Sequence, residues 1–529
     1  MFGAWPENPA ERTPSLIVLG SILALAAVLR FWALDHGIPY ALGVDEPEVL
    51  ERAVNMMKSG SLNPHFFDYP SLYIYVQVVS ACLRFLSGAI TGMWASLEQT
   101  GPEDFYVWGR AVTALFGVAT VWIVYRIGRR WGTREALLAA GLMAVLPLHV
   151  RQSHYVLTDV PLTAFVAAVM LLSQRANEAG TMSAFAWAGV AVGLATATKY
   201  NGAVALIIPL IACATSRTVT RPRLHLASVT AFCCGLAFLI AAPYTVLDLP
   251  AFLNGFARLS SIYRSLPPPP EPGWLIYLKH LRLVLGWPAL LALGGGLAFG
   301  FYHALRDRDR FRWLGVTVFP VCYFAFVADQ RLIFARYLLP ATPAICLLIA
   351  LAIVAAADAV RVSPLVPARA SVAPLVVLIV AAFALPTVQA IQFDRTIARR
   401  STIQLAHEWI QDNLPRKARV AVETRALLLA PEDYAAQNFP RLISDHLTHA
   451  SRDYQTYVHE GYEYLVASSQ AYGPIFDAPQ KAFDDYAAYR RLFDQSTELI
   501  RFTPTREHPG PELRIFRLTP APGQPRSLP

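Results

Sequence analysis

The chain has 529 residues, of which 55% are hydrophobic and only 16% are charged. Soluble proteins usually carry about 25% charged residues, so the composition excludes an ordinary soluble protein and favours a polytopic membrane protein. The net charge of +8 could indicate a nucleic-acid partner, but the arginines lie in short loops between apolar stretches. The positive-inside rule explains them better, and no nucleic-acid partner is expected.

The first apolar stretch, 16–32, follows a polar N-terminus without an Ala-x-Ala cleavage signal and is predicted to be an uncleaved anchor. Further spans are predicted at 108–125, 135–150, 160–174, 184–198, 202–215, 224–243, 282–303, 313–328, 338–357 and 372–391. The stretch 71–90 carries Gln77 and Arg84 and is expected to lie at the interface or to insert partly. The expected fold is a polytopic α-helical membrane protein with about 11 to 13 transmembrane helices.

Arginine-rich connections at 126–134, 217–223, 306–312 and 361–369 set the predicted orientation, because such loops face the cytoplasm. The segments 35–70, 151–159, 199–202, 244–281, 329–337 and everything after 392 then lie outside. We expect a multi-pass protein of a bacterial inner membrane. All six cysteines lie in apolar segments, so no disulfides are expected.

Three domains are predicted: a transmembrane domain at 1–391, an extracytoplasmic soluble domain at 392–520 and a flexible tail at 521–529. Helical spacing at 403–410 and strand patterns at 419–422, 464–467 and 513–518 predict a small α/β or α+β domain. Within the outer segment 246–281, the four prolines at 267–270 favour an extended, stiff path.

Two outer loops carry acidic residues beside the membrane. Asp45 and Glu46 follow the first span, and Asp159 begins a later one, after Arg151 and His154. Both acidic sites could simply cap helices. A carboxylate at the edge of the bilayer is costly unless it is paired or coordinating, so these residues are also candidates for a base, a phosphate-binding group or a metal ligand.

Basic and aromatic residues on the same predicted side complete the candidate set. Lys199 occupies a tight outer turn, where it could merely extend its ammonium to the surface or bind a lipid phosphate. Arg336 and Tyr337 stand in another outer segment, where an arginine runs against the charge rule and suits an anionic group. Tyr69 ends the aromatic stretch of the first loop.

The order of these motifs resembles the GT-C glycosyltransferases of the protein O-mannosyltransferase and aminoarabinose-transferase group. The motifs are Asp45-Glu46, Tyr-Pro-Ser-Leu at 69–72, Ser-His and then Asp-x-Pro within 153–161, Ala-Thr-Lys-Tyr-Asn-Gly at 197–202, and Arg-Tyr-x-x-Pro at 336–340. The resemblance covers roughly residues 15 to 345. Aminoarabinose transferases carry a lysine before the proline that ends the first loop, whereas this chain has Tyr69, which weakens an assignment of lipid A as acceptor.

The resemblance implies a polyprenyl-phosphate-linked monosaccharide as donor and inversion at the anomeric carbon. Asp45 matches the catalytic aspartate and Glu46 would position it or assist a metal. Asp159 matches the second-loop acid, whereas Lys199 and Arg336 would neutralise the phosphate. His154 and Tyr337 would line the pocket. A divalent metal at Asp45 and Asp159 is left open, and no other cofactor is expected.

The expected function is therefore inverting glycosyl transfer from this donor to an acceptor hydroxyl on a protein, lipid or glycan. Two alternatives remain. A sugar-lipid flippase or transporter should gather ionisable residues near the midplane and show internal repeats; a noncatalytic glycan-assembly protein would not depend on Asp45.

Overall fold

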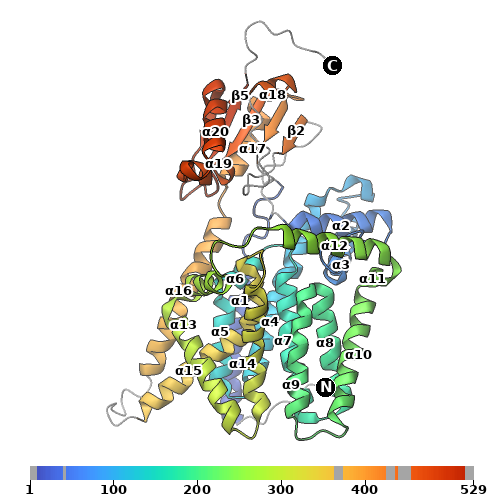
Figure 1. Cartoon of the computed structure of the whole chain (residues 1–529), viewed down its shortest axis with the longest axis vertical. Helices are drawn as coiled ribbons and strands as arrows, with labels where there is room; N and C mark the ends of the chain where they lie inside the picture. Colours follow the sequence, from blue (N-terminus) through green and yellow to red (C-terminus); the bar gives the residue numbers. More distant parts are fainter. Residues whose placement is uncertain are drawn as a thin grey trace. The chain divides into compact units, whose positions relative to one another are not determined.

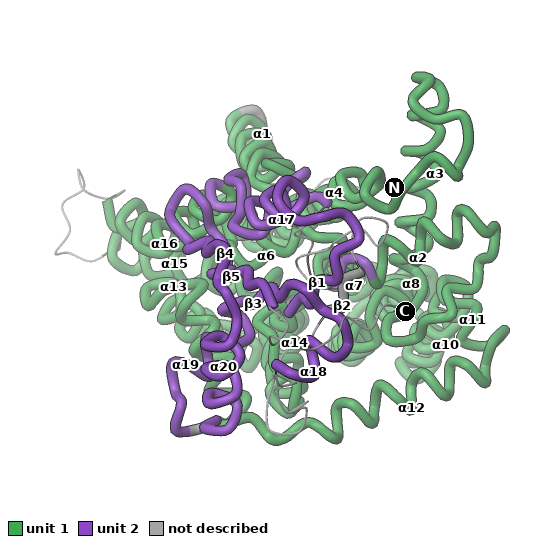
Figure 2. The backbone as a smooth tube through the Cα atoms, turned by 90° about the horizontal axis from the view of Figure 1, so that it is seen from above, with its two compact units in different colours: residues 1–34, 48–394 green, residues 35–47, 395–529 purple. Residues whose placement is uncertain are grey.

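The computed structural model of the chain describes residues 9–39, 43, 45–362, 373–423, 435–438 and 454–518. These residues divide into two compact units, the first made of Met1–Leu34 and Glu48–Asp394, the second of Asp35–Pro47 and Arg395–Pro529 (Figure 2). The predicted flexible tail, 521–529, lies outside the described residues.

Unit 1 is helical throughout its described part (Figure 1). Its α-helices are α1 (Pro9–Phe31), α2 (Glu46–Ser59, which begins in unit 2), α3 (Leu72–Ile90), α4 (Tyr106–Gly128), α5 (Thr133–Val145), α6 (Pro147–Gln152), α7 (Asp159–Ala179), α8 (Met182–Thr198), α9 (Ile207–Thr215), α10 (Arg223–Ala241), α11 (Tyr244–Leu247), α12 (Leu249–Ser265), α13 (Gly273–Arg306), α14 (Arg310–Ala328), α15 (Thr342–Arg361) and α16 (Ala373–Ile397). Short 3-10 helices are η1 (Leu97–Gln99), η2 (Pro102–Phe105), η3 (Tyr200–Leu206) and η4 (Ala335–Ala341).

Eight helical segments of the described chain are long and apolar enough to cross a membrane. They are Pro14–Phe31, Leu72–Ile90, Pro102–Gly128, Arg223–Ala241, Gly273–Arg306, Arg310–Ala328, Ala335–Arg361 and Ala373–Asn413. Shorter apolar helices, Met182–Thr198 and Tyr200–Thr215, lie where two more spans were predicted. The predicted polytopic helical fold is confirmed. The helix α3 is long and apolar enough to be a complete span, so its length and composition do not single out an interfacial position. Its interfacial placement stays a prediction.

The predicted span 135–150 is wrong as one continuous helix, because the backbone of Leu146 is extended between α5 and α6. Pro147 cannot donate the backbone hydrogen bond that would continue α5. The fully buried Arg30 of α1 replaces the missing donors: its Nη1 lies 2.8 Å from the Ala144 carbonyl and its Nη2 3.0 Å from the Met143 carbonyl. A carbonyl oxygen that has lost its helical hydrogen bond inside an apolar bundle needs another hydrogen-bond donor.

The predicted extended path across 246–281 is correct only around its four prolines, because the non-helical stretch 266–272 contains 267–270. It is wrong before and after them, where residues 249–265 form α12 and α13 begins at Gly273. The helix α13 that follows contains a second break, because Gly286 has φ +71° and Pro288 follows it. Gln389 of α16 donates to the Leu283 carbonyl beside this break, at 2.8 Å.

Close helix packing shapes the rest of unit 1. A Cβ atom at Gly189 or Gly193 of α8 would lie within 2.4 Å of a carbonyl oxygen of α10. Small residues four apart let two helix backbones approach in a membrane, so these glycines fix the α8–α10 contact.

The arginine-rich connections gather at one end of unit 1. Arg130, after α4, pairs with Asp309 between α13 and α14 at 2.7 Å, and Arg134 pairs with Asp358 near the end of α15 at 2.9 Å. The α9–α10 and α13–α14 connections lie at the lower end of the bundle in Figure 1, whereas α12 lies at the upper end. The arginine-rich connections thus lie at the same end of unit 1, which agrees with the prediction that they all face one side of the membrane.

Unit 2 contains a five-stranded sheet in the order β2-β1-β3-β5-β4. Its strands are β1 (Arg419–Val422), β2 (Ala435–Asn438), β3 (Tyr464–Ser468), β4 (Thr497–Phe502) and β5 (Leu513–Arg517), and its helices are α17 (Thr402–Asn413), α18 (Tyr454–His459), α19 (Ser469–Asp477) and α20 (Phe483–Gln495), with the 3-10 helix η6 (Pro479–Lys481). β1 pairs in parallel with β2 and β3, whereas β5 is antiparallel to β3 and β4. The predicted α/β or α+β character is confirmed.

Candidate functional site

A buried ion cluster forms in unit 1 where three separate segments meet. Lys199 Nζ lies 2.7 Å from Asp159 Oδ1, and Arg336 Nε lies 3.8 Å from Asp159 Oδ2. The Asp159 side chain is 4% exposed, that of Lys199 12% and that of Arg336 20%. The carboxylate is thus the buried centre, and the two cations extend from it toward the surface.

Local backbone structure puts each of these side chains in place. Asp159 is the first residue of α7, and Thr163 one turn later donates to its carbonyl at 2.7 Å. Lys199 is extended between α8 and η3, in a turn closed by the Gly202 amide on the Lys199 carbonyl at 2.8 Å. A Cβ on Gly202 would lie 2.5 Å from the Ala195 carbonyl, so the turn that projects Lys199 requires glycine.

Aromatic rings surround the cluster. Lys199 Nζ lies 4.7 Å from the ring centroid of Tyr337 and 5.7 Å from that of Tyr69, within the range of cation–π attraction. The Tyr337 hydroxyl lies 3.2 Å from the hydroxyl of Tyr263 in α12. Arg336 stacks its guanidinium over Phe334, at 4.4 Å. The predicted residues Tyr69, Lys199, Arg336 and Tyr337 therefore come together.

The helix α12 joins this cluster to the end of the first loop. Phe252 of α12 packs edge-on against Phe67, with centroids 5.7 Å apart, and Arg258 pairs with Asp68. Tyr200 donates to the Phe67 carbonyl at 3.0 Å. Arg331 donates to two carbonyls at the end of α12 and beyond it, which gives this outer arginine a structural partner.

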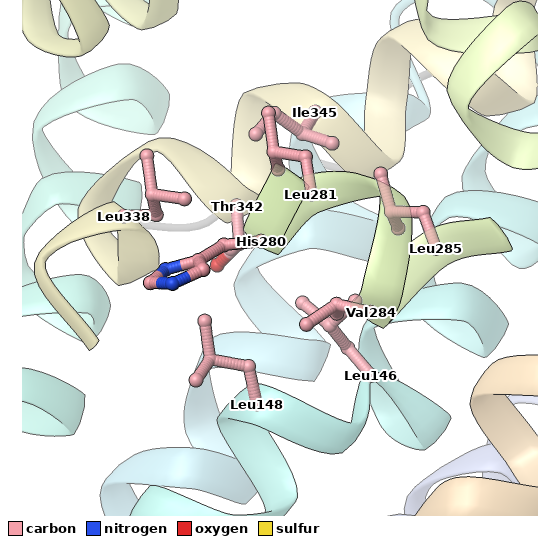
Figure 3. A pocket seen from close by; sticks show the side chains of 9 residues that line it. All are labelled: Leu146, Leu148, His280, Leu281, Val284, Leu285, Leu338, Thr342 and Ile345. Carbon is pink, nitrogen blue, oxygen red and sulfur yellow. The ribbon is translucent and has the colours of Figure 1, made fainter. Parts of the chain in front are cut away.

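An apolar pocket lies between α6, α13 and the η4–α15 segment (Figure 3). It is small, with a volume of about 10 Å³, and is lined by Leu146, Leu148, His280, Leu281, Val284, Leu285, Leu338, Thr342 and Ile345. Leu338 is two residues beyond Arg336, so η4 connects the ion cluster to the pocket. The pocket walls include the α5–α6 break at Leu146 and the residue before the α13 break, Leu285.

Asp45 and Glu46 belong to unit 2. Asp45 is half-buried and stands immediately before α2, whereas Glu46 is fully buried. The Glu46 carboxylate accepts a hydrogen bond from the Gly43 amide at 2.8 Å, and the Glu46 amide donates to the Gly43 carbonyl. Glu46 thus closes the turn that holds Asp45, which agrees with a positioning role.

His154 and Arg151 lie apart from these contacts in the described structure. His154 is buried, with Nδ1 2.9 Å from the Val150 carbonyl and Nε2 3.0 Å from the Trp32 carbonyl. Asp394 Oδ1 lies 3.6 Å from Nε2. These contacts tie α6 to α1 and α16 and favour a structural role for His154. Arg151 is exposed near the end of α6.

The described residues contain no group of three or more His, Cys, Asp or Glu side chains arranged to hold a metal ion. Asp159, one of the two candidate metal ligands, is already neutralised by Lys199 and Arg336. The arrangement of unit 1 therefore suits an anion better than a metal cation.

Two tyrosines, Tyr323 of α14 and Tyr277 of α13, were not predicted from the sequence. Asn201 donates to the Tyr323 hydroxyl at 2.8 Å, and Tyr277 lies fully buried nearby in α13. The available signal was a tyrosine inside an otherwise apolar span, which is equally common as packing. Only the fold shows that Tyr323 of α14 lies beside the turn that carries Lys199, because its hydroxyl accepts from Asn201.

A family model for dolichyl-phosphate-mannose-protein mannosyltransferases matches residues 105–243. This segment includes Asp159 and Lys199 but is only about a quarter of the chain. No curated protein sequence matches the chain.

Solved structures resemble the chain over almost its whole length. The archaeal oligosaccharyltransferase AglB from Archaeoglobus fulgidus, in complex with an inhibitory peptide and a dolichol-phosphate, is 13% identical with a TM-score of 0.56, over 98% of this chain and 76% of that chain. ArnT from Cupriavidus metallidurans bound to undecaprenyl phosphate is 14% identical with a TM-score of 0.56, over 98% of this chain and 100% of that one. Its apo state gives 16% and 0.55, over 96% and 98%. These likenesses confirm the expected GT-C resemblance at the level of the fold.

Proposed function

We propose that this chain, which has the GT-C fold, is an inverting glycosyltransferase that moves a monosaccharide from a polyprenyl-phosphate donor to an acceptor hydroxyl. The observation that carries the proposal is the Asp159–Lys199–Arg336 cluster, set in a helical unit that exposes many large apolar side chains. A polyprenyl phosphate combines the two chemistries that this arrangement suits, an apolar chain and an anionic group.

The two cations stabilise the departing phosphate. Lys199 and Arg336 share one carboxylate, so the cluster of three residues keeps a net positive charge. Their side chains are more exposed than that of Asp159 and can exchange part of this contact for phosphate oxygens. Fixed cations aimed at developing negative charge are among the largest contributions to catalysis. Arginine can bind phosphate with two parallel hydrogen bonds.

Asp45 is the proposed general base. It accepts the proton of the acceptor hydroxyl while the hydroxyl oxygen attacks the anomeric carbon, and the bond from that carbon to the phosphate oxygen breaks. The sugar is inverted and the polyprenyl phosphate leaves as an anion. Glu46 holds the turn that presents Asp45.

The donor class also agrees with what the similar proteins hold. The AglB structure contains a dolichol-phosphate and one ArnT structure contains undecaprenyl phosphate. The identities are low, so the sugar and the acceptor do not follow from the likeness. Protein, lipid and glycan hydroxyls all stay open as acceptors, and the sugar can be a hexose or a pentose.

The site is proposed to face the outside of a bacterial cytoplasmic membrane. The arginine-rich turns meet at one end of unit 1, and this end is cytoplasmic by the positive-inside rule. The ion cluster is built from segments predicted on the other side. The soluble unit that follows residue 394 is placed outside by the same rule. A transporter would instead be expected to hold its substrate near the midplane.

Transfer can be tested with purified protein in lipid nanodiscs, labelled polyprenyl-phosphate sugars and candidate acceptors. Release of polyprenyl phosphate together with a glycosylated acceptor supports the proposal. Lys199→Met should lower the transfer rate roughly 10²- to 10³-fold. Lys279→Met is a matched control, because Lys279 is half-exposed and pairs with Glu271. Donor movement across the bilayer without transfer to any acceptor would contradict the proposal.

A further inference from the structure

We propose that His154 is a positively charged positioning residue, whose charge holds in place the segment that carries Asp159; this inference rests on the proposed function. His154 Nδ1 lies 2.9 Å from the Val150 carbonyl oxygen, and Nε2 lies 3.0 Å from the Trp32 carbonyl oxygen. A carbonyl oxygen can only accept a hydrogen bond, and a neutral imidazole has a single N–H group to donate. The two contacts therefore select the imidazolium form, in which both ring nitrogens carry a proton.

A carboxylate lies where this charge needs one. Asp394 Oδ1 of α16 is 3.6 Å from His154 Nε2, and the two side chains are only 7% and 0% exposed. A carboxylate this close favours the charged form of a base. The ring of Phe393 packs edge-on against the imidazole, with centroids 5.3 Å apart. The charge of His154 is therefore paired with a carboxylate in a buried position.

The other ionisable groups around this junction have partners of their own. Arg30 of α1 also attracts Asp394, but its guanidinium donates to three backbone carbonyls. His149 Nδ1 lies 3.0 Å from Arg30 Nη2, and because a guanidinium can only donate, the His149 ring accepts there and is neutral. Arg110 of α4 donates to a carbonyl of the chain that follows α1, at 2.8 Å. Among these groups, Asp394 supplies the negative charge that faces His154.

The segment between His154 and Asp159 has little room to move. Residues 153–158 are buried or half-buried. Val156 packs so closely on α4 that a Cβ added at Gly109 would lie 3.0 Å from its side chain. Close-packed interiors transmit a displacement rather than absorb it. A shift of the His154 ring should therefore move Asp159, the carboxylate at the centre of the ion cluster.

The charge makes the position of Asp159 depend on pH. Loss of one ring proton leaves a nitrogen lone pair facing a carbonyl oxygen and leaves the Asp394 carboxylate without the charge beside it. The protonated form of His154 therefore stabilises this junction at lower pH, and the support is lost as the pH rises and the ring is deprotonated. Sugar transfer should fall at alkaline pH for this reason.

The protonation state is measured by NMR on the full-length protein in nanodiscs, with isotope-labelled histidine. His154→Gln identifies the signals of His154. At about pH 7.5, roughly one unit above the ordinary midpoint of histidine, both ring nitrogens should carry hydrogen. In Asp394→Asn one of them should have lost it. Asp358→Asn is the matched control, because Asp358 is a half-exposed carboxylate that pairs with Arg134, and it should leave both N–H groups in place.

The rate of transfer is then followed against pH in the same preparations. The alkaline loss should begin roughly 1–3 pH units lower in Asp394→Asn than in the wild type, and Asp358→Asn should follow the wild type. His154→Gln is neutral at every pH and offers one donor nitrogen in place of two. It should transfer roughly 10- to 100-fold more slowly than the wild type at neutral pH and lack this alkaline loss. A residue that only packs would lower the rate by the same factor at every pH.

Two results overturn the inference: a single N–H group on the wild-type ring at about pH 7.5, or an alkaline loss at the same pH in Asp394→Asn and the wild type. If the variants fail to fold, the N–H groups of the wild-type ring, assigned through its contact with Phe393, decide alone. Failure of the wild-type protein to transfer sugar to any acceptor would overturn the proposed function instead. The charge of His154 would still be decided, because NMR reports it without substrate.

Discussion

The buried contact between Asp159 and Lys199 allows a quantitative prediction. At 2.7 Å the attraction between two unit charges is about 6 kcal/mol for an effective dielectric constant near 20. The cost of removing both charges from water offsets much of this attraction, so the intact pair stabilises the fold far less. Removal of one partner is different, because it leaves a buried charge behind and typically costs about 3–5 kcal/mol.

Lys199→Met should therefore destabilise unit 1 by about 2–4 kcal/mol, with Arg336 at 3.8 Å limiting the loss. The double variant Asp159→Asn/Lys199→Met should be more stable than Lys199→Met alone, since the uncompensated carboxylate is gone. The coupling free energy between the two positions should be at least about 1.5 kcal/mol.

The measurement is a double-mutant cycle by reversible denaturation in detergent micelles. Arg134 and Asp358 form a matched control pair at 2.9 Å whose side chains are 52% and 43% exposed. Their coupling should stay below about 1 kcal/mol because water screens exposed pairs. Equal coupling in the two pairs, or a double variant less stable than Lys199→Met, would refute the reasoning.

Three further predictions concern the rest of the fold. Arg30→Met should lower the unfolding free energy by about 3 kcal/mol or more, because it leaves at least two buried carbonyls without donors. Denaturation of the full chain measures this loss, and a loss under about 1 kcal/mol would contradict the prediction. Burial raises the pKa of Glu423 to about 7 from 4.5, so its contribution to the stability of unit 2 is full below pH 4.5 and is lost as the pH rises through 7. Hydrogen exchange in unit 2 should show this loss of about 3 kcal/mol in the wild type and a flatter pH dependence in Glu423→Gln. Gly189→Val should separate α8 from α10, since even a Cβ would lie 2.3 Å from the Thr230 carbonyl. A disulfide engineered between the two helices should then form more slowly in the Gly189→Val chain than in a chain that keeps Gly189. Equal rates of disulfide formation would argue against the close contact.

Local sequence patterns predicted the helices and strands well where neighbours in the chain decide the structure. The strand at 419–422 matches β1 in both bounds, because β-branched valines in a short apolar run are a local signal. The break between α5 and α6 was missed because its stability depends on Arg30, which comes from a different helix. The same holds for α12, which contacts distant segments: Phe252 packs against Phe67, and the Arg264 carbonyl accepts a hydrogen bond from Arg331.

The candidate site was predictable where charge sets the position of a residue. Asp159, Lys199 and Arg336 were expected on one side of the membrane, and the described structure brings them into one cluster. Tyr277 and Tyr323 were not predicted, because neither has a local feature that separates it from packing residues. Tyr323 meets Asn201 and Tyr277 meets Phe324 only through the tertiary fold.

The central claim is that Asp45 removes the proton from the acceptor, and single-turnover transfer in the Asp45→Asn variant tests it most directly. With labelled donor already bound, the transfer rate should fall by about 10²- to 10⁴-fold. The donor dissociation constant should stay within a factor of about three of the wild-type value, since the isosteric substitution removes the base and leaves Lys199 and Arg336 in place. A transfer rate equal to that of the wild type would contradict the assignment of Asp45 as the base and, with it, the proposed mechanism.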